Sequence, residues 1–147
     1  VAWPEIHEGG GLYYQNTESS ERTGVEGPGR EYFETNHPEL VLPQNFASRG
    51  WWHRPHEELP ELLTRARRVQ EELLQQHGDS AHRVALITHG GFYHFFLSQL
   101  IDVAIPQDRT HWFHLNNVGI SHISFEEHRI RINYLNRVDF LLANLIT

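Results

Sequence analysis

Residues 83–92, with the sequence Arg-Val-Ala-Leu-Ile-Thr-His-Gly-Gly-Phe, limit the fold of this chain more than any other segment. Residues 84–87 are all apolar and show no polar alternation, which is typical of a strand covered on both faces in a parallel sheet. A second apolar stretch, 92–101, follows, and the two glycines before it let the backbone turn sharply into a helix. We therefore expect a buried strand that ends near His89 and a helix that begins directly after it.

His89 would then lie where a strand ends and a helix begins. The first N–H groups of a helix have no partner within the helix, and they attract anions. The N–H of Gly90 would be one of these donors. The sequence thus predicts an imidazole beside a pocket that fits an oxyanion.

The remaining sequence predicts strands interleaved with helices, which indicates an α/β fold. Residues 1–8 are interpreted as the end of a strand. Apolar residues at helical spacing predict a helix over 57–77, which Gly78 would terminate. A short helix is expected over 30–36, and residues 9–30, with six glycines, are expected to form a loop.

Near the C-terminus, residues 119–125 and 129–135 predict a hairpin with its turn at 126–128. We expect residues 1–147 to form one domain. Residues 9–56 would be a long loop or insertion over the active site, because long loops in compact domains are often functional.

Composition excludes several classes of function. The formal charge is −7 and no lysine is present, so nucleic acid is not an expected partner. The basic residues Arg65, Arg67 and Arg68 are interpreted as a solvated helix face paired with Glu61 and Glu72. No apolar run is long enough to span a membrane, and cysteine is absent, which favours a cytoplasmic location. A small anion remains a partner that converging arginines could bind.

Three segments resemble the histidine phosphatase superfamily, which includes the cofactor-dependent phosphoglycerate mutases and many broad phosphatases. Residues 84–92 resemble its second histidine motif. Residues 115–121, the hairpin and residues 134–139 look like the closing part of the same fold. Residues 5–11, Glu-Ile-His-Glu-Gly-Gly-Gly, resemble the segment in which a glutamate follows a strand and precedes glycines. The segments occur in the family order and span nearly the whole chain.

This resemblance implies a three-layer sandwich with a mostly parallel sheet and an antiparallel edge hairpin. It also implies a phosphohistidine mechanism without metal or cofactor, in which a second histidine and two arginines hold the phosphoryl oxygens. His89 matches this second histidine, and the Gly90 N–H would add a donor. Glu8 is our choice as the acid that protonates the leaving oxygen, with Glu5 as the alternative.

One part of the family pattern is absent. The nucleophilic histidine of the family lies in an Arg-His-Gly motif at the end of the first strand, and the chain contains no such tripeptide. Residue 1 is also not methionine. We therefore expect this to be the C-terminal portion of a histidine phosphatase domain, inactive alone. A leading segment, a partner chain, a homo-oligomer or a rearrangement would complete the sheet.

The expected function is a hydrolase that transfers the phosphoryl group of a small phosphorylated metabolite. A phosphoglycerate mutase-type isomerase is the first alternative. A catalytically dead domain that binds phosphorylated ligands for regulation is the second, and the absent nucleophile motif supports it.

Other candidate residues have two interpretations each. Arg54, Trp52 and Asn117 are candidates for substrate binding, but Trp52 could anchor the loop and Asn117 could form a turn. His111 and His114 could place two imidazoles close together, with His94 and His122 nearby. Their spacing is loose and cysteine is absent, so we expect no metal site.

Overall fold

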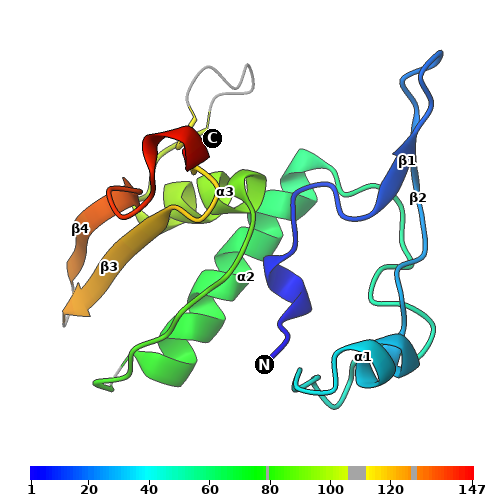
Figure 1. Ribbon diagram of the computed structural model, residues 1–147, viewed down its shortest axis with the longest axis horizontal. Helices are drawn as coiled ribbons and strands as arrows, with labels where there is room; N and C mark the ends of the chain where they lie inside the picture. Colours follow the sequence, from blue (N-terminus) through cyan, green and yellow to red (C-terminus); the bar gives the residue numbers. More distant parts are fainter. Residues whose placement is uncertain (79, 106–111, 127–128) are drawn as a thin grey trace.

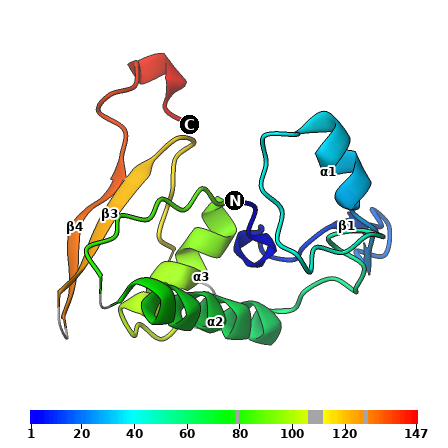
Figure 2. The same cartoon turned by 90° about the horizontal axis from the view of Figure 1, so that it is seen from below.

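Two helices form the centre of the computed structural model, which describes residues 1–78, 80–105, 112–126 and 129–147. They are α2 (Leu59–His77) and α3 (Gly90–Leu100), and they lie between the C-terminal hairpin and the N-terminal part of the chain (Figures 1 and 2). The other elements are η1 (Pro4–Ile6), β1 (Tyr13–Gln15), β2 (Arg22–Gly24), α1 (Arg30–Asn36), β3 (Ile120–Glu126), β4 (Arg129–Arg137) and η2 (Ala143–Leu145).

Helix α2 confirms the helix predicted over residues 57–77. A capping box starts it, in which the Glu58 side chain accepts from the N–H of residue 61 while the Glu61 side chain accepts from the N–H of residue 58. The C-terminal cap is Gly78, as predicted. Helix α1 has the predicted bounds, 30–36.

The hydrophobic core lies between α2 and α3. Helix α3 follows the glycine pair, as predicted, and carries most of the buried aromatic side chains. The rings of Phe92 and Phe96 stack with centroids 5.8 Å apart. Burial of this shared face holds the two helices together. The buried core residues are Leu62, Ala66, Val69, Phe92, Phe95, Phe96 and Leu100.

The strands form two antiparallel pairs. Tyr13 lies opposite Gly24 in the β1–β2 pair, and Ile120 lies opposite Arg137 in the β3–β4 pair. The β3–β4 pair confirms the predicted hairpin, whose turn residues 127 and 128 lie outside the described residues. Helices and strands are thus both present, and all strand pairing in the described part of the chain is antiparallel.

The strand predicted for residues 84–87 is not formed. Residues 83–88 run back along α2 toward α3 (Figure 1), and within the described residues they make no backbone–backbone hydrogen bond. The Val84 side chain is 47% exposed and Ile87 is 91% exposed. The prediction of a buried strand was wrong because apolar sequence alone does not make a strand: the backbone also needs a neighbouring strand to pair with.

Two predictions for the N-terminal part were also wrong. Residues 4–6 form a 3-10 turn and not a strand end, because Pro4 fixes its φ angle and suits the first position of a helical turn. Residues 9–30 contain the β1–β2 hairpin. Its turn is held by Asn16, whose side-chain oxygen accepts from the N–H groups of Glu18 and Ser19.

No helix in the described part of the chain combines the length and the apolar character that crossing a membrane requires.

Candidate functional site

The carboxylate of Glu8 lies at the N-terminal end of α3. Its Oε1 accepts from the N–H of Phe92 at 2.9 Å, and its Oε2 accepts from the N–H of Gly91 at 3.2 Å. Oε1 also accepts from the N–H of Gly9 at 2.7 Å. A helix N-terminus favours negative charge, because its first N–H groups have no helical partner. The first N–H groups of α3 therefore bind a carboxylate of the chain itself.

Glycine at position 91 makes this contact sterically possible. A Cβ atom at residue 91 would collide with the Glu8 carboxylate. At Gly90 the nearest atom to such a Cβ would be the Leu115 carbonyl oxygen, at 3.9 Å. Gly91 thus leaves room for the Glu8 carboxylate, and the space beside Gly90 is open.

His89 is the N-cap residue of α3, and its side chain is exposed. The preceding Thr88 donates its hydroxyl to the Ile6 carbonyl oxygen at 2.5 Å. This bond and the Glu8 contacts hold residues 6–8 beside the start of α3. His89 and Glu8, predicted from segments 81 residues apart in sequence, therefore flank the same helix start.

A buried ion pair fixes the segment that carries Glu8. Arg65 donates from Nε to Glu57 Oε1 at 2.7 Å and from Nη2 to Glu57 Oε2 at 2.6 Å. Arg65 Nη1 donates to the carbonyl oxygens of Glu5 and His7, at 2.7 Å and 3.0 Å. One guanidinium thus ties the residues on either side of Ile6 to helix α2.

The interpretation of Arg65 as a solvated residue was wrong. The residue is only 2% exposed, because it lies on the face of α2 that contacts η1. Its position could have been noticed in the sequence, since it falls on the same helical stripe as Leu62 and Val69. Glu57 carries no comparable signal, because it precedes the helix.

Glu5, the alternative proton donor, forms an ion pair with Arg68 of α2. Its carboxylate therefore points to the α2 surface, whereas that of Glu8 points to α3. The sequence had suggested that Arg68 pairs with Glu61 and Glu72. Among the described residues it makes neither pair.

His7 lies between the ion pair and two indole rings, with 10% of its side chain exposed. Its Nδ1 lies 2.6 Å from the Pro4 carbonyl oxygen, and its ring centroid lies 5.3 Å from that of Trp51 and 5.0 Å from that of Trp52. Burial, together with the positive charge of Arg65, lowers the pKa of His7 below its ordinary value of 6.5. His7 is therefore neutral near pH 7.

The pKa of Glu57 lies below its ordinary value of 4.5. Burial alone would raise it, but the hydrogen bonds and the positive charge of Arg65 more than offset that effect. Glu57 is therefore ionised near pH 7, and its charge is matched by that of Arg65.

The other substrate-binding candidates have defined contacts. The indole of Trp52 is 2% exposed and covers Gly11, where a Cβ atom would collide with the ring. The guanidinium of Arg54 lies 4.3 Å above that indole and 3.6 Å from the Glu57 carboxylate, with half of its side chain exposed. Asn117 donates to the hydroxyl of Thr147 at 2.7 Å, in the C-terminal segment.

Histidines do not gather into a metal site of three or more side chains in the part of the chain that the structure describes. No group of three or more His, Asp or Glu side chains has the geometry to hold a metal ion there. The ring of His94 stacks on Trp112 at 4.2 Å, and that of His122 lies 5.5 Å from Tyr134. His111 lies outside the described residues.

This arrangement can bind an oxyanion and move a proton. The N–H groups of Gly91 and Phe92 can donate to a phosphoryl oxygen when the Glu8 carboxylate moves aside. An imidazole and a carboxyl group beside such an anion are groups that transfer protons in catalysis.

Comparison with protein-family models matched a large part of the chain. The family model of the histidine phosphatase superfamily (branch 1) matches residues 23–138, which include α2, α3, His89 and both strands of the C-terminal hairpin. Glu8 lies before the matched residues. The comparisons with curated proteins and with solved structures gave no significant match.

Proposed function

The chain belongs to the histidine phosphatase superfamily, and from this premise we propose that it forms part of a hydrolase that removes the phosphoryl group of a small phosphorylated metabolite. The reaction would run through a phosphohistidine, with the nucleophilic histidine on a segment outside these 147 residues. The observation that carries the proposal is the position of Glu8 at the start of α3, next to His89.

The residues at this helix start suit phosphoryl transfer. Negative charge spreads over three phosphoryl oxygens in the transition state, so donors fixed in advance stabilise it. His89 would be such a donor, and so would the N–H groups of Gly91 and Phe92 once the Glu8 carboxylate has moved off them. As the nucleophilic nitrogen bonds to phosphorus and the ester P–O bond breaks, the leaving oxygen takes a proton from Glu8. Water then attacks the phosphohistidine, with Glu8 accepting its proton, and no metal or cofactor is required.

The proposal includes a further strand beside residues 83–88, which would complete a three-layer sandwich with a mostly parallel sheet. Among the described residues, 83–88 make no backbone–backbone hydrogen bond, and the side chains of Val84 and Ile87 are exposed, which supports this. A paired strand would satisfy the unpaired backbone groups, and a covering layer would bury the exposed apolar side chains. Both changes are favourable. A leading segment or a partner chain, including a second copy of this chain, would supply the strand.

A regulatory domain that binds phosphorylated ligands without turnover is a second candidate. The observation in its favour is the absence of an Arg-His-Gly tripeptide from the sequence. Such a domain would keep the anion site at α3, and it would need no leaving-group acid.

Substrates with different leaving groups test the hydrolase proposal. The protein is assayed with the proposed nucleophilic segment, using an alkyl phosphate and an aryl phosphate. His89→Ala should slow both by about 10²–10³-fold, because a transition-state donor is lost. Glu8→Gln should slow the alkyl ester by about 10²–10⁴-fold and the aryl ester much less, because a phenolate leaves without protonation.

The matched control for Glu8→Gln is Glu5→Gln, which removes the alternative acid paired with Arg68. Glu8 would not be the proton donor if Glu8→Gln slowed both esters equally, or if Glu5→Gln slowed the alkyl ester selectively. Binding of vanadate or phosphate near Gly90 without turnover of either ester would favour the regulatory candidate.

A further inference from the structure

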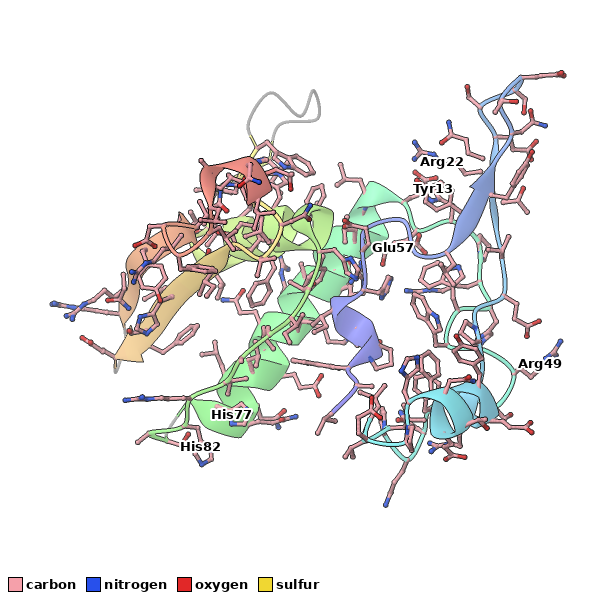
Figure 3. All side chains as sticks on the ribbon, in the orientation of Figure 1. Tyr13, Arg22, Arg49, Glu57, His77 and His82 are labelled. Carbon is pink, nitrogen blue, oxygen red and sulfur yellow. The ribbon has the colours of Figure 1, made fainter. Side chains whose placement is uncertain are left out.

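Two histidine side chains meet at the C-terminal end of α2 (Figure 3). His77 is the last residue of the helix, and His82 lies on the segment that leads away from it. Their Nδ1 atoms lie 3.1 Å apart, and their ring centroids lie 5.3 Å apart with the ring planes at 67°. Two lone pairs at this distance would repel each other, so one Nδ1 carries a proton that the other accepts. Two imidazole nitrogens thus converge on one small cation.

Ser80 fixes the turn between the two rings. Its hydroxyl donates to the carbonyl oxygen of His77 at 2.7 Å and accepts from the N–H of His82 at 3.3 Å. The N–H of Ser80 also donates to the His77 carbonyl oxygen, at 3.1 Å. The backbone that carries both imidazoles is therefore held in place before any ligand binds, which reduces the entropy that binding would cost.

The spacing of the two nitrogens suits a transition-metal ion. Zinc bonds to imidazole nitrogen at about 2.0–2.1 Å. With bonds of that length, two nitrogens that lie 3.1 Å apart correspond to an N–Zn–N angle of about 100°. This value lies between the angles of about 90° and about 109° that octahedral and tetrahedral coordination require. The ion could thus replace the proton with little movement of either ring.

The surroundings of the pair also suit a cation. His77 is partly buried and His82 is exposed, so an ion can reach the two nitrogens from the solvent. The C-terminal end of a helix carries partial negative charge, which favours a cation beside its last residue. No third His, Asp or Glu side chain among the described residues joins the pair, so water would fill the remaining positions of the metal.

We propose that His77 and His82 bind one divalent transition-metal ion of the zinc type through their Nδ1 atoms. Each ring then carries its proton on Nε2, and the proton now on one Nδ1 moves there by exchange with water. The ion would tie residue 82 to the end of α2, and so fix the point from which residues 83–88 begin. The Glu57–Arg65 pair lies at the other end of the helix, so this site is independent of the proposed phosphoryl-transfer site.

Zinc binding to the 147-residue chain tests this proposal. Calorimetry at about pH 7.5, above the ordinary imidazole pKa of about 6.5, gives the dissociation constant and the stoichiometry after the protein has been treated with a chelator. The variants are His77→Asn and His82→Asn. The control is His114→Asn, which removes an exposed histidine whose Nε2 lies 2.7 Å from Asn116 Oδ1. Magnesium is the control ion, because it prefers oxygen ligands.

The wild type should bind one zinc ion at its tightest site and should not bind magnesium there. Each variant of the pair should weaken this site at least about tenfold, because two linked ligands exceed the affinity of one by about 10²–10⁴-fold. His114→Asn should bind as the wild type does. Imidazole ¹⁵N spectra should show zinc on Nδ1 and a proton on Nε2 of both His77 and His82.

Four results would overturn the site. They are a wild type that binds no zinc, unchanged affinity in either variant of the pair, an equal loss in His114→Asn, and ¹⁵N spectra that place zinc on other histidines. Circular dichroism of each variant measures its helix content. Unchanged helix content in His77→Asn and His82→Asn should accompany the weaker binding, because neither side chain belongs to the hydrophobic core.

Discussion

Glu57 and Arg65 form a two-point ion pair in which both side chains are almost fully buried, with N–O distances of 2.7 Å and 2.6 Å. The same guanidinium binds the carbonyl oxygens of Glu5 and His7. The position of the loop that carries Glu8 therefore depends on a contact made on helix α2. The segment that meets the start of α3 is thus held in part by a buried arginine of α2.

Breaking this pair should destabilise the fold. Glu57→Gln leaves the Arg65 guanidinium buried without a counter-charge, so the free energy of unfolding should fall by about 3–5 kcal/mol. Urea denaturation followed by tryptophan fluorescence measures the change. Arg131→Gln is the control, because it removes the exposed pair with Glu126 and should cost less than about 1 kcal/mol. Similar small losses in both variants would contradict the structural role of the buried pair.

Stability should fall in two stages as the pH falls. The pKa of His7 is lowered from 6.5 and that of Glu57 from 4.5, so each group binds protons more readily in the unfolded chain. Each contribution is complete above the unfolded pKa and is lost as the pH falls toward the folded pKa. The loss should therefore begin near pH 6.5 and steepen below pH 4.5.

Denaturation curves collected from pH 8 to about pH 4 measure this dependence. His7→Asn should remove the first stage, whereas His37→Asn, an exposed histidine on another part of the chain, should keep it. A first stage of unchanged size in His7→Asn would show that another group causes it.

Removing the charge of Glu8 should strengthen phosphate binding to the 147-residue chain. In Glu8→Gln an amide oxygen can still accept from Phe92, but the negative charge that opposes an incoming anion is gone. A like charge about 4 Å away in water opposes binding by about 1 kcal/mol, so the affinity for inorganic phosphate should rise about fivefold. Amide chemical shifts of Gly91 and Phe92 report the titration by NMR.

The control for this titration is Glu18→Gln, which removes a carboxylate from the turn between β1 and β2. Its phosphate affinity should equal that of the wild type. A Glu8→Gln chain with weaker phosphate binding would mean that the carboxylate organises the anion site and does not compete for it.

Hydrogen exchange should reveal whether residues 83–88 acquire a partner strand. In the 147-residue chain, the amides of these residues should exchange rapidly, because they make no backbone hydrogen bonds within the described residues. Addition of the proposed segment or partner chain should slow their exchange by orders of magnitude, while amides of the β3–β4 pair should change little. Fast exchange at residues 83–88 in the completed protein would refute the added strand.

The sequence alone was sufficient for features that depend on neighbouring residues. The helices over 30–36 and 57–77 and the hairpin near the C-terminus follow from local periodicity and end signals, and the structure confirms them. The glycine pair that starts α3 was likewise evident. The family was also correctly inferred, because its motif combines an apolar run, a histidine and glycines in a short stretch.

Tertiary structure decided the features that depend on distant partners. Apolar residues 84–87 predicted a strand, yet strand pairing requires hydrogen bonds from another segment, which periodicity cannot supply. Arg65 was expected to be solvated because its side chain is charged. Its burial depends instead on Glu57 and on two carbonyl groups of a remote loop. The sequence also predicted Glu8 and His89 as site residues from separate segments. Only folding brought Glu8 to the first N–H groups of α3, because a hydrogen bond depends on distance in space and not on separation along the chain.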